Sequence, residues 1–407
     1  MPKPELLSPA GDLEKLKVAF AFGADAVYMG GKALGMRAKA KNFDFDEMEE
    51  GIKYAHKLGK KVYITANIFA HNDDFTGMEE YLQKLNKMKA DALIISDFGV
   101  FELAKKTVPD MPIHISTQAN TTNWRAVNFW KNLGANRVVL ARELTLNEIS
   151  EIRDNTAGIE IETFVHGAMC MAYSGRCIIS NYMNHRDANR GECSHPCRWN
   201  YTLVEELSGK SVPVFEDDKG TYIFSSKDLC MIEHIPALVN AGISSFKIEG
   251  RMKTSHYVAA VTKTYREAID DYFEKPEFYH SKIEHYNEEL AKTHHRDFTT
   301  GFFFGPVDEN DYYYQGDKQI KTQHFLALVE DYDENTGYCK VLQRNKFEAG
   351  DNIEILRAKG KNHTQKIDFM YDTDGNKIDS APHPKQIIKF KAEVPVEKFD
   401  IIRKVTE

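Results

Sequence analysis

Four cysteines stand close together near the middle of the chain, in the spacing C-x6-C-x15-C-x3-C. They are Cys170, Cys177, Cys193 and Cys197. Glycines lie among them, and glycine allows a backbone to turn around a bulky centre. Structural zinc sites draw their ligands from tight C-x2-4-C pairs, which here only Cys193 and Cys197 resemble. The wide first gaps suit an iron–sulfur cluster better, so the spacing favours iron–sulfur and leaves zinc open.

The pattern of apolar residues indicates the scaffold that must hold these cysteines. Short β-rich runs alternate with amphipathic helical segments over about 270 residues. The predicted strands are 5–8, 26–29, 62–66, 92–96, 113–117, 137–140, 160–165 and 245–248. The predicted helices are 12–22, 46–58, 78–88, 100–107, 123–133, 146–153, 228–240 and 256–272. Eight such repeats predict an α/β fold, a (β/α)8 TIM-like barrel.

The remaining architecture follows from where this pattern changes. A doubly wound open sheet is the alternative to the barrel, but no G-x-G-x-x-G follows the first strand. We expect the barrel to span 1–275, with a long cysteine-bearing insertion at 167–227 that carries the cluster. A connecting segment follows at 276–320, and strands separated by turns predict a small all-β barrel at 321–407.

A barrel of this kind gathers functional groups at the carboxyl ends of its strands. We refer to the carboxyl end of the barrel as its mouth and to the insertion that carries the four cysteines as the cysteine segment. We expect four catalytic candidates at this mouth, beside the cysteine segment: His114, Gln118, His166 and Glu249. Four residues at the same strand ends could bind substrate: Asn67, Arg142, Lys247 and Arg251. Fixed cations in a partly dry mouth bind carboxylate or phosphate strongly. A strand-end histidine is more often structural, and a buried Lys247–Glu249 pair is the structural alternative for Lys247.

Two basic stretches would meet at the same mouth. Lys32, Arg37 and Lys39 follow the second strand without an intervening acid, and Arg186 and Arg190 lie in the cysteine segment. Either stretch alone could be a solvated surface. Because both follow strands of one barrel, we expect them to contact phosphate groups together.

Composition excludes several other classes of protein. The chain has 407 residues, 42% hydrophobic and 28% charged, with a formal net charge of −8. A net negative charge argues against general nucleic-acid binding but permits a local basic patch. The apolar runs are shorter than the roughly 20 residues that cross a bilayer. The N-terminus lacks the apolar segment of a signal peptide, so we expect a cytoplasmic protein without membrane contact.

Several motifs together resemble a known family. ELLSPAG, GADAVYMGG, HISTQAN, ETFVHGAMCMAYSGRC, NRGECSHPCRW, SSKDL and KIEGR are similar to peptidase family U32 along nearly the whole chain. The C-x3-C ending and the C-terminal strands are most similar to its tRNA hydroxylation branch, and hydroxylation of ribosomal RNA remains an alternative. A U32-type peptidase or collagenase-like protease is a further alternative, although H-E-x-x-H and G-x-S-x-G are absent.

The resemblance implies a specific chemistry. It implies a [4Fe-4S] cluster on Cys170, Cys177, Cys193 and Cys197. It implies an enzyme, a tRNA uridine C5-hydroxylase, that takes part in making 5-hydroxyuridine at the wobble position. The route would be oxygen-independent, with prephenate as co-substrate and an electron donor whose identity the sequence does not give. The RNA partner would be the anticodon loop of tRNA, with the wobble base splayed out of its stack.

Overall fold

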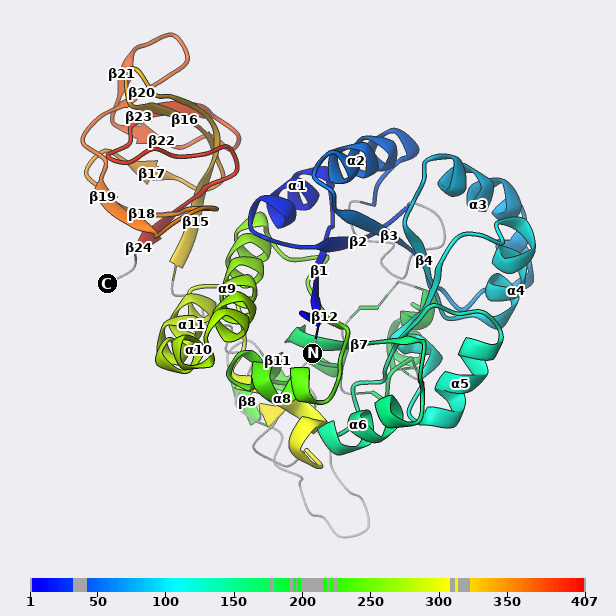
Figure 1. Cartoon of the computed structure of the whole chain (residues 1–407). Coiled ribbons are helices and arrows are strands. Elements are labelled where there is room, and N and C mark those ends of the chain that lie inside the picture. The colour runs from blue at the N-terminus through cyan, green and yellow to red at the C-terminus, as the bar shows by residue number, and fades with distance from the viewer. Residues whose placement is uncertain are drawn as a thin grey trace.

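The core of the molecule is a closed barrel of eight parallel strands. The computed structural model describes residues 2–31, 42–170, 172–175, 177, 179–190, 193–194, 196–198, 215–217, 220–222, 225–307, 312–313 and 323–405. The barrel strands are β1 (Glu5–Pro9), β2 (Ala26–Gly30), β3 (Lys61–Ala66), β4 (Ala92–Ile95), β5 (Ile113–Ile115), β6 (Arg137–Val139), β7 (Glu160–Ala168) and β12 (Ser245–Ile248). Strand β12 pairs with both β1 and β7, which closes the ring seen end-on in Figure 1. The predicted TIM-like fold is confirmed.

Helices surround the ring and bury one face each against it. They are α1 (Leu13–Ala21), α2 (Phe45–Lys57), α3 (Met78–Lys87), α4 (Phe98–Thr107), α5 (Trp124–Asn132), α6 (Leu146–Asp154), α8 (Ile235–Asn240) and α9 (Ser255–Glu274). Several begin at a side chain that accepts a hydrogen bond from the first turn, as Asp44 does from the Glu47 backbone N–H at 2.9 Å. None of the helices in the described part of the chain combines the length and apolar character that a bilayer crossing demands.

The predicted helix at 228–240 is wrong over its first half. Asp228–Cys230 form the short strand β11, which pairs antiparallel with the end of β7. A single 3-10 turn, η5 (Ile232–His234), then leads into α8. The apolar spacing of this segment suits a helix, but the unpaired edge of β7 beyond the barrel offers backbone hydrogen bonds that the segment takes instead.

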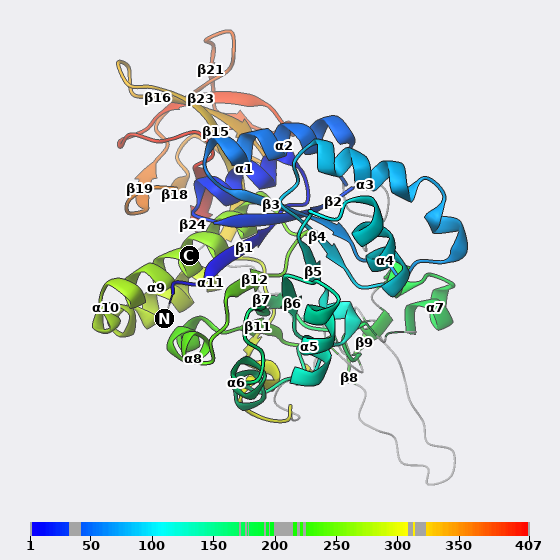
Figure 2. The same cartoon turned by 45° about the vertical axis from the view of Figure 1, so that its right-hand side comes forward.

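The chain after the barrel first adds helices and then a separate antiparallel sheet. Helices α10 (Pro276–Ser281) and α11 (Ile283–Ala291) pack beside α9. The sheet comprises β15 (Gln323–Asp333), β16 (Tyr338–Gln343), β18 (Asn352–Leu356), β19 (His363–Lys366), β20 (Met370–Tyr371), β21 (Lys377–Ile378), β23 (Ile387–Lys391) and β24 (Ile401–Val405). It wraps around its own apolar core next to α9 (Figure 2), which confirms the predicted C-terminal all-β unit.

One fully buried arginine joins this C-terminal unit to the helices of the barrel. Arg403, on β24, is 0% exposed. Its guanidinium contacts Glu289 of α11 at 2.7 Å and Glu354 of β18 at 2.9 Å. Lys263 of α9 adds a hydrogen bond to the backbone oxygen of Arg357 at 2.7 Å. A buried charge is tolerated only where such partners neutralise it, so these contacts fix the C-terminal unit against α9 and α11.

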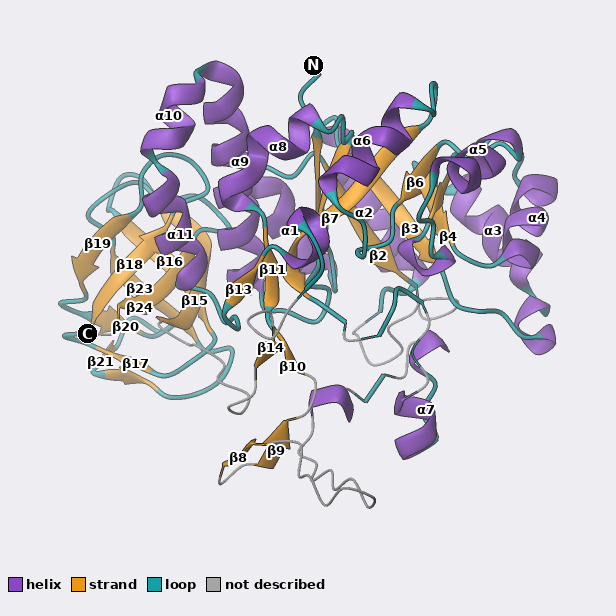
Figure 3. Ribbon diagram, turned by 90° about the horizontal axis from the view of Figure 1, so that it is seen from below, coloured by secondary structure: helices purple, strands orange, loops and turns teal. Residues whose placement is uncertain are grey.

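The cysteine segment lies at the carboxyl end of the strands. It contains α7 (Ile179–Asn184) and the short turns η3 (Ala188–Arg190) and η4 (Pro196–Arg198), and a small hairpin of β8 (Phe215–Asp217) and β9 (Gly220–Tyr222) follows. Figure 3 shows α7 and the hairpin below the barrel, on the side opposite the N-terminus. The chemistry-bearing segment thus covers the end of the barrel where such folds bind their substrates.

Candidate active site at the barrel mouth

A cavity of about 350 Å³ lies between the strand ends and the cysteine segment. All four clustered cysteines line it, as the sequence predicts. The barrel contributes the other predicted residues of its wall: Asn67, Gln118, Arg142, Lys247, Glu249 and Arg251. Tyr28, Ile94 and Phe164 provide aromatic and apolar surface within it. Polar groups that converge on a largely apolar cavity are the usual form of a small-molecule or base-binding site.

Close backbone contacts hold the cysteine segment against the barrel. Gly175 has φ +73°, and a Cβ placed there would stand only 2.3 Å from the backbone oxygen of Gln118. The position therefore requires glycine, both for its backbone conformation and for the lack of space. Asn189 donates a hydrogen bond to the backbone oxygen of Cys177 at 3.0 Å and accepts one from the Phe69 backbone N–H at 3.3 Å. The loop that carries the thiols is thus fixed to two strand ends.

Hydroxyl groups order the second half of the same segment. The Ser180 and Ser194 hydroxyls lie 3.0 Å apart, and Asn184 donates to Ser194 at 2.8 Å. On the barrel side, the Ser174 backbone N–H donates to the Glu143 carboxylate at 2.8 Å. These bonds connect residues on both sides of the cysteines. The segment is therefore positioned by side-chain hydrogen bonds rather than by long helices or strands.

The four thiols form a donor set that fits a cluster. The pKa of Cys177 is raised by a hydrogen bond with Cys170 and by burial, and the nearby Cys193 raises it further. Each thiol makes it harder for its neighbour to lose a proton. The cysteines would therefore become thiolates only when a positively charged metal centre binds to them. Within the described residues, no three His, Cys, Asp or Glu side chains are grouped closely enough to hold one metal ion. The thiolates of a four-iron cluster bind four different iron atoms, and so enclose a larger centre than one ion.

A pair of amides forms one wall of the cavity. Asn67 donates from Nδ2 to the Gln118 Oε1 at 2.5 Å and to the Ser116 hydroxyl at 3.3 Å. Asn67 is 9% exposed, and its Oδ1 finds no hydrogen-bond partner among the described residues. A buried acceptor without a partner costs stability, so a hydrogen bond from a bound molecule to this oxygen would be favourable, although neighbouring side chains must move to expose it. The predicted placement of Asn67 and Gln118 at the mouth is confirmed.

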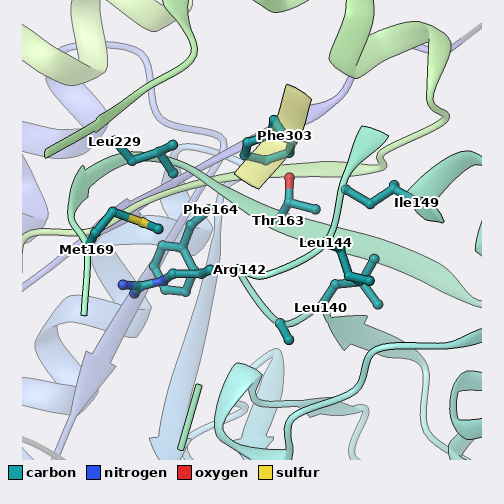
Figure 4. Close-up of a pocket in the computed structure, with 10 residues that line it drawn as sticks. Leu140, Arg142, Leu144, Ile149, Thr163, Phe164, Met169, Leu229 and Phe303 are labelled. Atoms are coloured by element: carbon teal, nitrogen blue, oxygen red, sulfur yellow. The ribbon is translucent and has the colours of Figure 1, made fainter. Parts of the chain in front are cut away.

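Arg142 and Arg251 approach the cavity from different strands. The Arg142 guanidinium stacks over the Phe164 ring at 4.1 Å and donates to the Ala168 backbone oxygen at 2.9 Å. Figure 4 shows Arg142 beside Phe164 and pointing towards Met169, above a small space of about 10 Å³. Arg251 is buried, and its Nη1 donates to the Thr65 hydroxyl at 3.1 Å.

The backbone around Arg251 is shaped to its guanidinium. A Cβ at Gly30 would lie 2.3 Å from the Arg251 Nη1, so glycine at the end of β2 makes the space for it. Guanidinium groups keep their charge when buried and bind planar anions through several N–H donors. Two such groups in one wall give the cavity a preference for an anionic molecule.

The carboxylate partner of Lys247 is not Glu249, the partner that the sequence suggests. The Lys247 Nζ donates to the Glu162 carboxylate at 2.7 Å, and both side chains are buried in the barrel. Glu162 also contacts Arg137 at 2.9 Å. Burial alone would raise the pKa of Glu162, but Lys247 and Arg137 lower it to about 2. The charge of Lys247 is therefore largely neutralised inside the barrel, although its side chain still reaches the cavity.

His114 lies at the opposite end of the barrel from the predicted mouth. It lines a different cavity of about 460 Å³, together with Lys61, Tyr63 and Arg137. In the register of the sheet, His114 faces Arg137, the first residue of β6, and thus lies near the amino ends of the strands. Burial and the neighbouring Arg137 hold the pKa of His114 well below its usual value. The prediction that it stands at the strand end beside Gln118 is wrong.

His166 is near the cysteines in sequence but does not line the cavity. It is 1% exposed and packs against Tyr265, Tyr257 and Phe298. Burial lowers the pKa of His166 to about 3. Its backbone oxygen accepts the Glu249 N–H at 2.8 Å, which positions the loop after β12. The geometry therefore gives His166 a positioning contact with Glu249 and no direct approach to a ligand in the cavity.

The predicted phosphate-binding cations are only partly described. Lys32, Arg37 and Lys39 lie outside the described residues, as does the side chain of Arg190. Arg186 is described and is half-buried, and its backbone N–H donates to the Ser180 oxygen at 3.3 Å. The contacts of these five cations with phosphate stay a prediction.

Sequence reasoning did not identify several residues of the cavity wall. Tyr28, Ser116, Asn189 and Lys253 all line it. Lys253 follows Arg251 by two residues, and Ser116 stands two residues before Gln118, so proximity to residues already singled out was the available signal. Asn189 directly precedes Arg190, but its contact with Phe69 depends on how the segment folds back and could not be read from that position.

Comparison with known proteins assigns the chain to a group of related sequences. Peptidase family U32 matches residues 11–312, and the Peptidase family U32 C-terminal domain matches residues 321–403. The tRNA hydroxylation protein P1 of Bacillus subtilis is 44% identical over 99% of this chain and 95% of its own length. The tRNA hydroxylation protein P of Escherichia coli is 39% identical over 93% and 92%. A protein of Methanocaldococcus jannaschii, described as an uncharacterized protease, is 46% identical over 86% of each chain.

Proposed function

The chain belongs to peptidase family U32, and we propose that it is an RNA-modifying enzyme that takes part in hydroxylating the wobble uridine of tRNA to 5-hydroxyuridine. Relatives named as tRNA hydroxylation proteins match it over nearly the full length of both chains. The observation that carries the proposal is the shared cavity, which four cysteines, a buried amide pair and two arginines line together.

The amide wall is suited to the edge of a pyrimidine base. With its Nδ2 engaged by Gln118, Asn67 presents Oδ1 as an acceptor. Uracil carries an N–H at position 3, where cytosine carries an acceptor. An acceptor at the wall therefore favours uracil, since the wrong base would leave two acceptors facing each other. The base must leave its stack to reach this wall, as single-stranded loops of RNA allow.

The cations of the cavity are suited to a small dicarboxylate, and we propose prephenate as that co-substrate. Arg142 and Arg251 each present a planar guanidinium, and planar guanidinium groups bind carboxylates in a fixed orientation. Lys247 contributes less than the sequence suggests, because Glu162 already neutralises it. Glu249 lines the same cavity and could move a proton on a bound molecule.

The four cysteines would hold a [4Fe-4S] cluster at the outer side of the cavity. Such a cluster would supply one-electron transfer. The two electrons that the uridine loses would go to the co-substrate as it gives up a hydroxyl group, and an external electron donor would serve only to reduce the cluster beforehand. The role of this chain is then to bind the base and the dicarboxylate side by side and to limit the access of water. The loop contacts of Gly175 and Asn189 keep the thiols at a fixed position relative to the amide wall. The remaining predicted cations would contact the phosphates of the anticodon loop.

Mass spectrometry of tRNA nucleosides tests the proposal. A strain that lacks this protein and any redundant hydroxylase should lose 5-hydroxyuridine and its derivatives, and the wild-type protein should restore them. Cys170→Ser should not restore them, whereas Cys339→Ser should, because Cys339 is buried in the C-terminal sheet away from the cavity. Unchanged tRNA nucleosides in the deletion strain would refute the proposal. Loss of a hydroxylated nucleoside from ribosomal RNA instead would identify the alternative substrate.

Among the described residues that line the cavity, no cysteine has a histidine beside it that could act as its base. Cysteine peptidases depend on a thiol whose pKa is lowered by a neighbouring histidine. Here the pKa of Cys177 is raised, and His114 and His166 do not line the cavity. A cleavage assay with peptide substrates should accordingly show no activity that depends on a single cysteine.

A further inference from the structure

One outer face of the C-terminal sheet concentrates lysine and tyrosine. In β16 and β23 alternate residues are buried, so the residues between them point outward. The outward positions of four adjacent strands include Tyr338 and Lys340 on β16, Lys389 and Lys391 on β23, Tyr371 on β20 and Lys377 on β21. We refer to these six residues as the lysine face. Strands β20, β21 and β23 lie at the end of the C-terminal unit that is farther from α9 (Figure 1).

The register of the strands places like charges side by side. Lys340 stands directly opposite Lys389, and Tyr338 stands opposite Lys391. Like charges at directly opposed positions destabilise a sheet. None of Lys340, Lys389 and Lys391 forms an ion pair among the described residues of the C-terminal sheet. Lys389 and Lys391 have no acid directly opposite them on the strands they pair with, so an external anion is the expected source of the missing negative charge there.

Other lysines of the same unit do have carboxylate partners. Lys346 contacts Glu348 at 2.6 Å, Lys359 contacts Glu397 at 3.0 Å, and Lys398 contacts Glu330 at 3.8 Å. These three lysines therefore differ in their partners from Lys340, Lys389 and Lys391, and they provide matched controls within the same unit. The lysine face also contrasts with the chain as a whole, whose formal net charge is −8.

Acidic residues border the lysine face along β15 and also in the turn between β20 and β21, where Asp372 and Asp374 follow Tyr371. Asp331 and Asp333 of β15 stand opposite Lys340 and Tyr338. The Asp333 carboxylate is already engaged by the Asn335 backbone N–H and the Thr336 hydroxyl of the following turn. Asp331 and Asp333 thus border the lysine face and do not neutralise Lys389 and Lys391.

Aromatic rings lie between the lysines. The Tyr338 and Tyr371 rings meet edge to face, with centroids 5.8 Å apart. Tyrosine surfaces next to lysine side chains are typical of proteins that bind single strands or loops of RNA, because bases stack on the rings while the ammonium groups contact phosphate. Figure 3 shows β20 and β21 at the lower edge of the C-terminal unit, the side at which the barrel strands end.

We propose that the lysine face is a second RNA-contact surface, which binds the sugar-phosphate backbone of the tRNA at a distance from the cavity. This inference rests on the proposed function, since it names a further contact with the same substrate. The face would supply affinity for tRNA without reading its sequence, because phosphate contacts position a nucleic acid and base contacts specify it. The cavity would then select the base.

Binding of tRNA to the full-length protein tests this inference with two matched triple variants. Lys340→Gln, Lys389→Gln and Lys391→Gln together remove three charges from the lysine face. Lys346→Gln, Lys359→Gln and Lys398→Gln remove three charges from ion-paired lysines of the same unit. All six side chains are solvent-accessible at the surface, so both variants should fold. The dissociation constant for unfractionated tRNA is measured at several salt concentrations for each protein.

The lysine-face variant should bind on the order of tenfold more weakly at moderate salt. Its slope of log affinity against log salt should be shallower by about two to three. The control variant should retain the wild-type affinity and slope. Equal behaviour of the two variants would overturn the inference, while wild-type hydroxylation of tRNA in cells would leave the proposed function intact. Reduced hydroxylation with unchanged tRNA binding would mean that the face binds a partner other than RNA, and would also overturn the inference.

Discussion

Glu162 offers a direct test of how the barrel holds its charged interior. Its carboxylate is fully buried between Lys247 and Arg137. The pKa of Glu162 falls from the ordinary value of 4.5 to about 2. At about 1.4 kcal/mol for each pH unit, that difference corresponds to about 3 kcal/mol of stabilisation at neutral pH. Glu162→Gln should therefore lower the free energy of unfolding by about 3–5 kcal/mol, the usual cost of removing one partner of a buried ion pair.

The sign of the pH dependence follows from the same residue. A carboxylate whose pKa is lower in the folded state stabilises the protein above its unfolded pKa and loses this contribution on acidification. The contribution of Glu162 should thus be complete above about pH 4.5 and lost between about pH 4.5 and 2. The destabilisation caused by Glu162→Gln should shrink over the same interval.

The assay is denaturant unfolding followed by tryptophan fluorescence. Of the three tryptophans, Trp124 and Trp130 lie on α5 and Trp199 belongs to the cysteine segment, while the C-terminal sheet contains none, so the signal reports on the barrel and its insertion. The matched control is Glu160→Gln. Glu160 contacts the same Arg137 at 2.6 Å, but its side chain is 55% exposed, and exposed ion pairs contribute about 1 kcal/mol or less. Equal and small effects of both substitutions would refute the assigned role of Glu162.

Three further expectations concern the site and the charged groups of the fold. Cys170→Ser should abolish the visible absorption, iron and acid-labile sulfide of protein purified without air, whereas Cys339→Ser should preserve all three; a colourless wild-type protein that contains zinc would contradict the cluster. Asn67→Ala should reduce hydroxylation about tenfold, the worth of one hydrogen bond to the base, and should also lower the free energy of unfolding by about 1–3 kcal/mol, because Gln118 and Ser116 lose their donor. Full activity of the folded variant would exclude base recognition by this amide. Burial and the neighbouring Arg403 lower the pKa of His256 to about 3, so this histidine stays neutral in the folded protein. Its contribution to stability should therefore fall by about 1.4 kcal/mol for each pH unit below about 6.5. His256→Gln should reduce this slope, whereas a substitution at the exposed His280 should not.

The barrel could be predicted because its signal is local and repeated. Each strand is a short apolar run between turn residues, and each helix has one apolar face, so eight repeats remain recognisable when single boundaries are uncertain. The strand predicted at 245–248 has the observed bounds of β12, and the helix predicted at 146–153 ends one residue early. Where a segment responds to a distant neighbour the prediction fails, as at β11, which pairs with the end of β7.

The height of a residue along the barrel axis could not be predicted. Strands of a barrel are staggered, so position within a strand does not give the distance from the mouth. His114 is the middle residue of β5, yet the stagger places it beside the first residue of β6. Lys247 is likewise directed to Glu162 by the pairing of β12 with β7, which the sequence does not reveal. Such partners depend on contacts between residues that are far apart in the chain.

The two halves of the site depend on a small number of contacts between distant segments. The thiols come from the insertion, and the amides and guanidinium groups come from the strand ends. Gly175 lies against Gln118, the residue that also orients Asn67, so the loop that carries the thiols rests on the wall that would bind the base. A shift of this loop would therefore move the thiols and the amide wall together. The fold thus couples the position of the four thiols to the position of the amide wall through the close contact of Gly175 with Gln118.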